Sequence, residues 1–292
     1  RTAHIRDVGG SNPSSATILT VLFFPYFIYY LKMFKKFIKK YFFNKKNNSL
    51  LENKSLINLN YNEKILNNLN FDIEKINKIL RENKKNYLNP RLSWHYHIFA
   101  NFSSEEKYNI LEIGTYDGAF TNFISKIFPN SKIFTIDLPN NNSDFINTYD
   151  RDSLEKFNEF IKIRKKNLEM NNIKFDQIDS FNLLEHFSEK KFDFIFIDGD
   201  HLNPQVTIDI FQSIKLLKKG GLIVTDDIVK DFNNVFNSLE KNAPYVDSQS
   251  YFTLERLCKR NLIENDYILK YTSPKKTKEK YKYLCITKLP ND

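Results

Sequence analysis

Acidic side chains follow directly after short apolar segments at four places between residues 137 and 227. Asp137, Asp179 and Asp198 each follow one such segment, and the pair Asp226 and Asp227 follows another. If these segments are parallel strands, their carboxyl ends meet along one edge, where open α/β sheets bind ligands. Carboxylates at such an edge accept hydrogen bonds from hydroxyl groups and ligate hard cations. The sequence therefore predicts a ligand site built largely from acids.

A turn bounded by Gly114 and Gly118 follows the first apolar segment. Gly114 allows a ligand to approach the backbone, and Gly118 allows the next helix to pack closely. The turn lacks the three glycines of G-x-G-x-x-G that admit a pyrophosphate, so with Glu112 before it the turn suits a cationic, phosphate-free ligand. The predicted ligand contacts here are Glu112, Gly114, Thr115, Tyr116, Asp117 and Gly118. The alternative is an ordinary strand-to-helix turn.

Two further positions point to an adenosine group. Asp137 lies about twenty residues after the glycine turn, where a carboxylate accepts both ribose hydroxyls. Asp179 and Ser180 follow the third apolar segment, where a short polar side chain reaches an adenine edge. The alternative for these acids is a helix cap or a solvated loop position.

These residues require an alternating series of strands and helices to position them. The apolar segments predict strands, and residues at helical spacing predict the helices between them, the last of which ends at Gly220 and Gly221. The expected strands are 108–113, 132–136, 174–178, 192–197 and 222–225, and the expected helices are 119–128, 153–170 and 204–217. Alternation of this kind indicates an α/β fold, a Rossmann-like, doubly wound and mainly parallel sheet. Residues 267–271 and 281–288 predict a final antiparallel pair.

Residues before the sheet form a helical N-terminal extension in this interpretation. Asp72 is expected to cap a short helix, and a second helix covers 92–102. Residues 44–70 are rich in Asn and Lys and predict a loose connector. His95 and His97 receive no role from the sequence.

Four motifs in order, Glu112–Gly118, Asp137, Phe192–His201 and Gly220–Asp227, resemble class I S-adenosylmethionine-dependent methyltransferases. The resemblance covers roughly residues 90–290. Within that class the chain is most similar to the small-molecule O-methyltransferases of the catechol, caffeoyl-CoA and macrolide-sugar type. The resemblance implies S-adenosylmethionine as cofactor and a seven-stranded sheet whose last strand is antiparallel.

The same resemblance implies the chemistry of the later motifs. It makes Asp198, Asp226 and Asp227 ligands of a divalent cation, and hard oxygen ligands suit Mg²⁺. It also makes His201 the general base, a task that suits imidazole, and it places Asp198 in both the catalytic and the cofactor-binding groups. Asp200 has two interpretations, a third metal ligand or a cap of the following helix.

Composition narrows the class of protein. The chain has 292 residues, is 41% hydrophobic and 27% charged, and carries a net charge of +9. The abundance of Asn, Lys, Ile, Phe and Tyr, as an AT-rich genome encodes, accounts for much of that charge, so a nucleic-acid partner is not expected. Two cysteines, Cys258 and Cys285, are too few for a disulfide framework, which favours a reducing cytoplasm.

The N-terminal residues predict segments of a different kind. Residues 1–17 resemble a translated transfer-RNA gene, so 1–32 are expected to be open-reading-frame overrun before Met33. The rival for 18–31 is a membrane-associated segment, although 14 residues with Pro25 fall short of the roughly 20 of a membrane span. Residues 33–43 predict a basic amphipathic helix. That helix either contacts an anionic membrane surface or packs on the domain with its lysines in solvent.

The expected organisation is overrun over 1–32, a helical and linker extension over 33–90, and a methyltransferase domain over 91–292. The expected activity is transfer of a methyl group from S-adenosylmethionine to a hydroxyl of a small molecule, with a sugar among the candidates and a divalent metal assisting. The alternatives are an RNA or protein methyltransferase, or a non-catalytic Rossmann-like binding domain at a membrane surface. The absence of an Asn/Asp-Pro-Pro-aromatic tetrad argues against methylation of base amino groups.

Overall fold

The structure is a computed structural model of the chain. It describes residues 60–87, 92–148, 151, 153–230, 248–270 and 282–290. Three predicted segments lie wholly or mostly outside these residues: the overrun over 1–32, the amphipathic helix over 33–43 and the connector over 44–70. Among the helices described, none combines the length and the apolar character that crossing a membrane requires.

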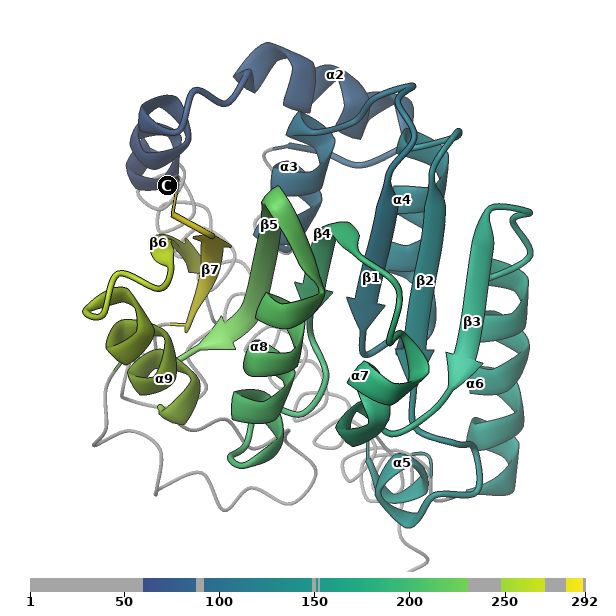
Figure 1. The fold of residues 1–292 in the computed structure, drawn as a ribbon. Helices are drawn as coiled ribbons and strands as arrows, with labels where there is room; N and C mark the ends of the chain where they lie inside the picture. The colour runs from purple at the N-terminus through teal and green to yellow at the C-terminus, as the bar shows by residue number, and fades with distance from the viewer. Residues whose placement is uncertain are drawn as a thin grey trace, which may run out of the picture. The chain divides into compact units, whose positions relative to one another are not determined.

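A seven-stranded sheet forms the centre of the fold, with strand order β3-β2-β1-β4-β5-β7-β6 (Figure 1). Its strands are β1 (Asn109–Ile113), β2 (Lys132–Asp137), β3 (Ile173–Gln177), β4 (Phe192–Ile197), β5 (Leu217–Ile228), β6 (Glu264–Lys270) and β7 (Lys282–Lys288). Neighbours among β1 to β5 are parallel, whereas β7 runs antiparallel to both β5 and β6. This confirms the predicted Rossmann-like sheet with an antiparallel last strand.

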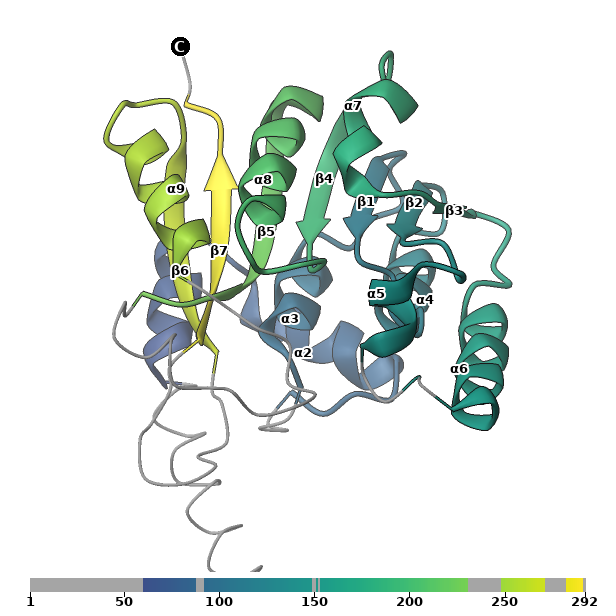
Figure 2. The ribbon, with the colours of Figure 1, turned by 90° about the horizontal axis from the view of Figure 1, so that it is seen from below.

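Helices cover both faces of the sheet (Figure 2). One face packs against α2 (Ile73–Glu82), α3 (Trp94–Asn101) and α4 (Ala119–Ile127), and the other packs against α7 (Leu183–His186), α8 (Gln205–Leu216) and α9 (Gln249–Cys258). The remaining helices are α5 (Ser143–Asn147), α6 (Leu154–Asn167) and the 3₁₀ turn η1 (Ser180–Asn182). The central strand β4 is apolar on both sides because Phe194 and Phe196 face the first helix layer while Ile195 and Ile197 face the second.

Several elements differ from the prediction. The helical extension is more regular than expected, since residues 60–68 are helical and Leu66 is buried in one core with Ile76 and the sheet. The helices α5, α7 and α9 were not predicted. The fifth strand begins at Leu217, so Gly220 and Gly221 lie inside β5. Pairing with β4 passes from Phe192–Leu217 to Phe194–Leu222, and Gly220 adopts a φ of +77° in this irregular segment.

Candidate functional site

The carboxyl ends of β1, β2, β4, β5 and β6 carry the polar residues that could act on a ligand. The turn after β1 lies directly against the end of β4. Asp198 N donates to Ile113 O at 2.8 Å, and Gly114 has a φ of +96°. A Cβ atom on Gly114 would lie 2.2 Å from the Asp198 carbonyl oxygen. The glycine is therefore required by the approach of two backbone segments, and Gly118 in turn packs against Leu168 of the segment after α6.

Glu112 is buried below this turn with a side-chain hydroxyl on either side. Thr121 and Thr135 donate to the same carboxylate oxygen, Oε2, at 2.5 and 2.6 Å. The Thr115 hydroxyl lies 2.6 Å from that of Thr135, which links the turn to this group. Burial raises the pKa of Glu112 to about 8, although the two hydroxyl donors oppose the shift. The residue is thus a desolvated acid that an arriving cation would ionise.

Asp137 at the end of β2 binds the turn and an arginine. Its two oxygens accept from the backbone N–H groups of Tyr116 at 3.0 Å and Leu138 at 2.8 Å. Arg164 Nη1 of α6 lies 3.6 Å from Asp137 Oδ2. Burial raises the pKa of Asp137, and the Arg164 charge opposes that rise. The acid is held in place at the position where the sequence predicts ribose binding.

The remaining predicted contacts of the cofactor also make local hydrogen bonds. Asp117 accepts from Ala119 N at 2.9 Å at the start of α4. Asp179 accepts from Phe181 N at 2.9 Å and so caps η1. The Ser180 hydroxyl accepts from Gln205 of α8. These bonds fix the loops at the ends of β1 and β3, and adenine recognition by Asp179 and Ser180 stays a prediction.

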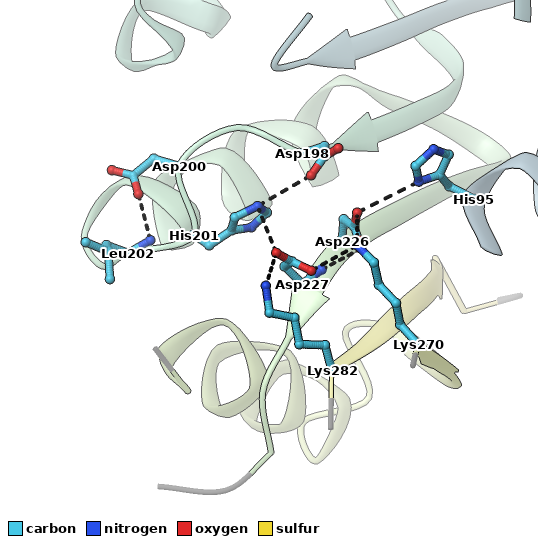
Figure 3. Close-up of polar contacts among 9 residues, drawn as sticks. All are labelled: His95, Asp198, Asp200, His201, Leu202, Asp226, Asp227, Lys270 and Lys282. Carbon is cyan, nitrogen blue, oxygen red and sulfur yellow. Dashed lines mark hydrogen bonds and ion pairs between the residues drawn. The ribbon is translucent and has the colours of Figure 1, made fainter. Parts of the chain in front are cut away.

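Asp198 and His201 come together at the end of β4 (Figure 3). The His201 side chain is 6% exposed, and its Nε2 lies 3.4 Å from Asp198 Oδ1 and 3.9 Å from Asp227 Oδ2. Burial lowers the pKa of His201, but the hydrogen bond to Asp198 and the charge of Asp227 outweigh it, so the pKa is raised. Asp200 is exposed and accepts from Leu202 N at 2.9 Å in the loop before α8, whereas α8 has Pro204 as its N-cap residue and receives no side-chain cap, so Asp200 does not cap that helix.

Asp226 and Asp227 are both engaged by lysines of the β6–β7 hairpin (Figure 3). Lys270 Nζ lies 2.7 and 2.6 Å from the two oxygens of Asp226 and 2.9 Å from Asp227 Oδ1. Lys282 Nζ contacts the other oxygen of Asp227. The charge of Lys270 holds the pKa of Asp226 well below its usual range despite burial. Both predicted ligands of β5 therefore already have cationic partners.

These contacts bear on the divalent metal that the resemblance implies. The set Asp198, Asp226 and Asp227 does not fit a bare divalent cation, because lysine ammonium groups occupy the oxygens of two of the three. In the part of the chain that the structure describes, His95, Asp198 and Asp226 form the group whose ligand atoms all lie within 4.8 Å of one another. His95 Nδ1 is buried without a hydrogen-bond partner and lies 3.8 Å from Asp226 Oδ2. A metal here would have to share Asp226 with Lys270.

Sequence reasoning missed His95, Arg164, Lys270 and Lys282 as members of the site. Lys270 and Lys282 end β6 and begin β7, the hairpin that the sequence predicts. The carboxyl edge of the sheet includes the end of β6 and, because β7 is antiparallel, the start of β7. Both lysines were predictable as site residues, because they are the charged residues at those two strand ends.

Comparison with known proteins finds similarity to methyltransferases. Residues 111–228 match the methyltransferase domain family. Malonyl-acyl-carrier-protein O-methyltransferase 2 from Ilyobacter polytropus is 29% identical over 181 residues, which are 61% of this chain and 61% of that protein. The chain thus spans about three fifths of the length of this curated relative.

Solved structures with a similar arrangement include two O-methyltransferases. One is TomG from Streptomyces achromogenes in complex with SAM, at 17% identity and a TM-score of 0.48, covering 75% of this chain and 89% of that one. The other is the Bacillus cereus O-methyltransferase in complex with SAH, at 17% identity and a TM-score of 0.42, covering 79% and 97%. The family match spans β1 through β5, the strands that carry the glycine turn and the predicted acids. Residues 111–228 are therefore similar to a methyltransferase domain.

Proposed function

We propose that this chain transfers a methyl group from S-adenosylmethionine to a hydroxyl of a small molecule. The observation that carries the proposal is His201, a buried imidazole 3.4 Å from Asp198 at the sheet edge that also bears the glycine turn. The match to the methyltransferase domain family supports methyl transfer. The curated relative is an O-methyltransferase, which supports oxygen as the acceptor atom.

In this proposal the cofactor lies across the ends of β1, β2 and β4. Glu112 binds its ammonium group and Asp137 its ribose hydroxyls. The backbone of the turn lines the cofactor from Gly114 to Gly118, Asp198 flanks it, and Asp179 and Ser180 reach the adenine. The buried carboxyl of Glu112 supports the first assignment, because a buried acid is stabilised by a cationic partner.

The chemical step needs a hydroxyl oxygen in line with the sulfonium methyl group. The oxygen forms a bond to the methyl carbon, the carbon–sulfur bond breaks, and its electron pair stays on sulfur to give S-adenosylhomocysteine. The acceptor proton passes to the His201 imidazole, which Asp198 orients. Holding both reactants in line supplies much of the rate enhancement, and proton transfer supplies a further part. No step is routed through a metal ion, because the predicted ligand set does not fit one.

The acceptor class and the location of the protein are further parts of the proposal. A sugar hydroxyl is one of the acceptors to test, because the group that the chain resembles includes macrolide-sugar enzymes. A cytoplasmic location remains a prediction, and Cys258 and Cys285 are free cysteines in the structure.

Transfer of labelled methyl from S-adenosylmethionine to a panel of phenols, sugars and nucleosides tests the proposal. With the acceptor found, His201→Asn should lower kcat by about 100-fold or more, the range of general acid–base catalysis, and leave cofactor binding in place. His186→Asn is the matched control, because His186 also pairs with a carboxylate, Asp176 at 2.9 Å, but on α7. Equal rates for His201→Asn and the unaltered protein would remove His201 from the mechanism.

A further inference from the structure

Lys270 makes the most complete ion pair at the acidic edge of the sheet. Its ammonium contacts both oxygens of Asp226 and one oxygen of Asp227, at 2.6 to 2.9 Å. Asp226 is 2% exposed, so water does not compete for these oxygens. A buried carboxylate needs such a partner, because an uncompensated charge is costly at this depth.

The backbone of β5 brings two consecutive acids to one cation. Residues that follow one another in a strand normally point to opposite faces. Here pairing with β7 is irregular between Thr225 and Ile228, and Asp227 adopts a φ of +54°. This left-handed conformation is uncommon for a residue other than glycine. It allows Asp226 and Asp227 to share Lys270.

The hairpin places two lysines where strand pairing alone disfavours them. Lys270 and Lys282 are directly paired across β6 and β7. Like charges in that arrangement are destabilising. Both ammonium groups point to the same pair of acids, with Lys282 on the second oxygen of Asp227 (Figure 3). The acids offset the repulsion, so the two lysines and two acids form one electrostatic unit.

The charges of this unit leave little room for a divalent ion. The two lysines balance the charges of Asp226 and Asp227, and Asp198 beside His201 adds one negative charge, so the unit and Asp198 together form a cluster with one negative charge. A divalent cation would reverse the sign of the cluster. It would also stand beside the Lys270 ammonium, bound to the same oxygens, where repulsion between cations is strong.

We propose that Lys270 is the resident cation of this cluster, in the place that the resemblance gives to a divalent metal. Lys270 then acts as a positioning residue that holds Asp226 and Asp227 beside His201. The inference rests on the proposed function only in treating this edge as the acceptor side. Binding of Mn²⁺ alone, followed by electron paramagnetic resonance of the free ion, tests it without an acceptor or turnover.

The unaltered full chain should bind no stoichiometric Mn²⁺. Lys270→Met should bind one ion, with an affinity at least about tenfold above any residual affinity of the unaltered chain, because the freed carboxylates then attract a cation. Lys218→Met is the matched control. Lys218 pairs with both oxygens of Asp193 at 2.9 and 2.8 Å, but Asp193 lies near the start of β4, and this variant should bind no Mn²⁺.

Stoichiometric Mn²⁺ binding by the unaltered chain would overturn the inference, and this result needs no variant to fold. A folded Lys270→Met protein that binds no Mn²⁺ would overturn it too, since Lys270 would then fill no cation site. Calorimetry with S-adenosylmethionine on the same samples separates these outcomes from failure of the proposed function. If the unaltered chain does not bind S-adenosylmethionine, the proposed function is refuted, whatever the Mn²⁺ result.

Discussion

Glu112 shows how a single buried residue links the fold to its ligand. Its carboxyl is 2% exposed, and both hydroxyl donors that the structure gives it act on one oxygen. With a pKa of about 8, the group is mostly protonated in the folded apo protein at neutral pH, while in the unfolded chain it is ionised. The folded state therefore binds the extra proton, and that linkage makes stability fall as pH rises from about 4.5 to about 8.

Glu112→Gln should remove this dependence, because the amide is neutral at every pH and its oxygen still accepts from the two threonines. Relative to the unaltered protein, the free energy of unfolding of the variant should rise by up to about 1.4 kcal/mol for each pH unit across that window. Urea unfolding of the apo protein at a series of pH values measures the difference. Glu189→Gln, at an exposed position, is the control. Parallel stability curves for Glu112→Gln and the unaltered protein would contradict the burial argument.

At the scale of elements, the turn after β1 is fixed by the strand beside it. Gly114 combines a φ of +96° with a hypothetical Cβ that would lie 2.2 Å from the Asp198 backbone. Backbone atoms cannot move aside as the end of a flexible side chain can. The clash would therefore shift the end of β4 and the residues that it carries.

Gly114→Ala should therefore cost more than the conformational penalty alone. Gly220→Ala is the matched control, because Gly220 also has a positive φ, +77°, but nothing lies within 4 Å of its Cβ position. We expect a loss of about 1 to 2 kcal/mol for Gly220→Ala and a clearly larger loss for Gly114→Ala, with weakened cofactor binding in the latter. Chemical denaturation measures both. Equal losses would show that the contact with β4 carries no cost.

The elements that the sequence predicted are those with strong local signals. Apolar runs gave β1 to β4 nearly to the residue, and Asp72 caps α2 as predicted by accepting from Lys75 N at 2.9 Å. The predicted start of β5 at Leu222 was wrong. Gly220 and Gly221 indicate a turn in the sequence, whereas pairing with β4 makes the strand begin at Leu217. Tertiary pairing of this kind has no signature in a short window of sequence.

At the scale of the whole molecule, the topology decides which residues meet. The sequence predicted that acids gather at the carboxyl edge, and the structure places Asp198, Asp226 and Asp227 together around His201. It could not predict that Lys270 and Lys282 join them, because that contact depends on β7 lying between β5 and β6. His95 likewise reaches Asp226 only because α3 packs on the sheet.

The central claim is that the carboxyl edge of this sheet is an S-adenosylmethionine site. Isothermal titration calorimetry of the full chain with S-adenosylmethionine and S-adenosylhomocysteine tests it most directly. The account predicts saturable binding of each ligand at one site per chain, and a ligand at 100 times its Kd should also raise the free energy of unfolding by about 2.7 kcal/mol. Absence of binding for both ligands, in a sample shown to be folded, would contradict the account.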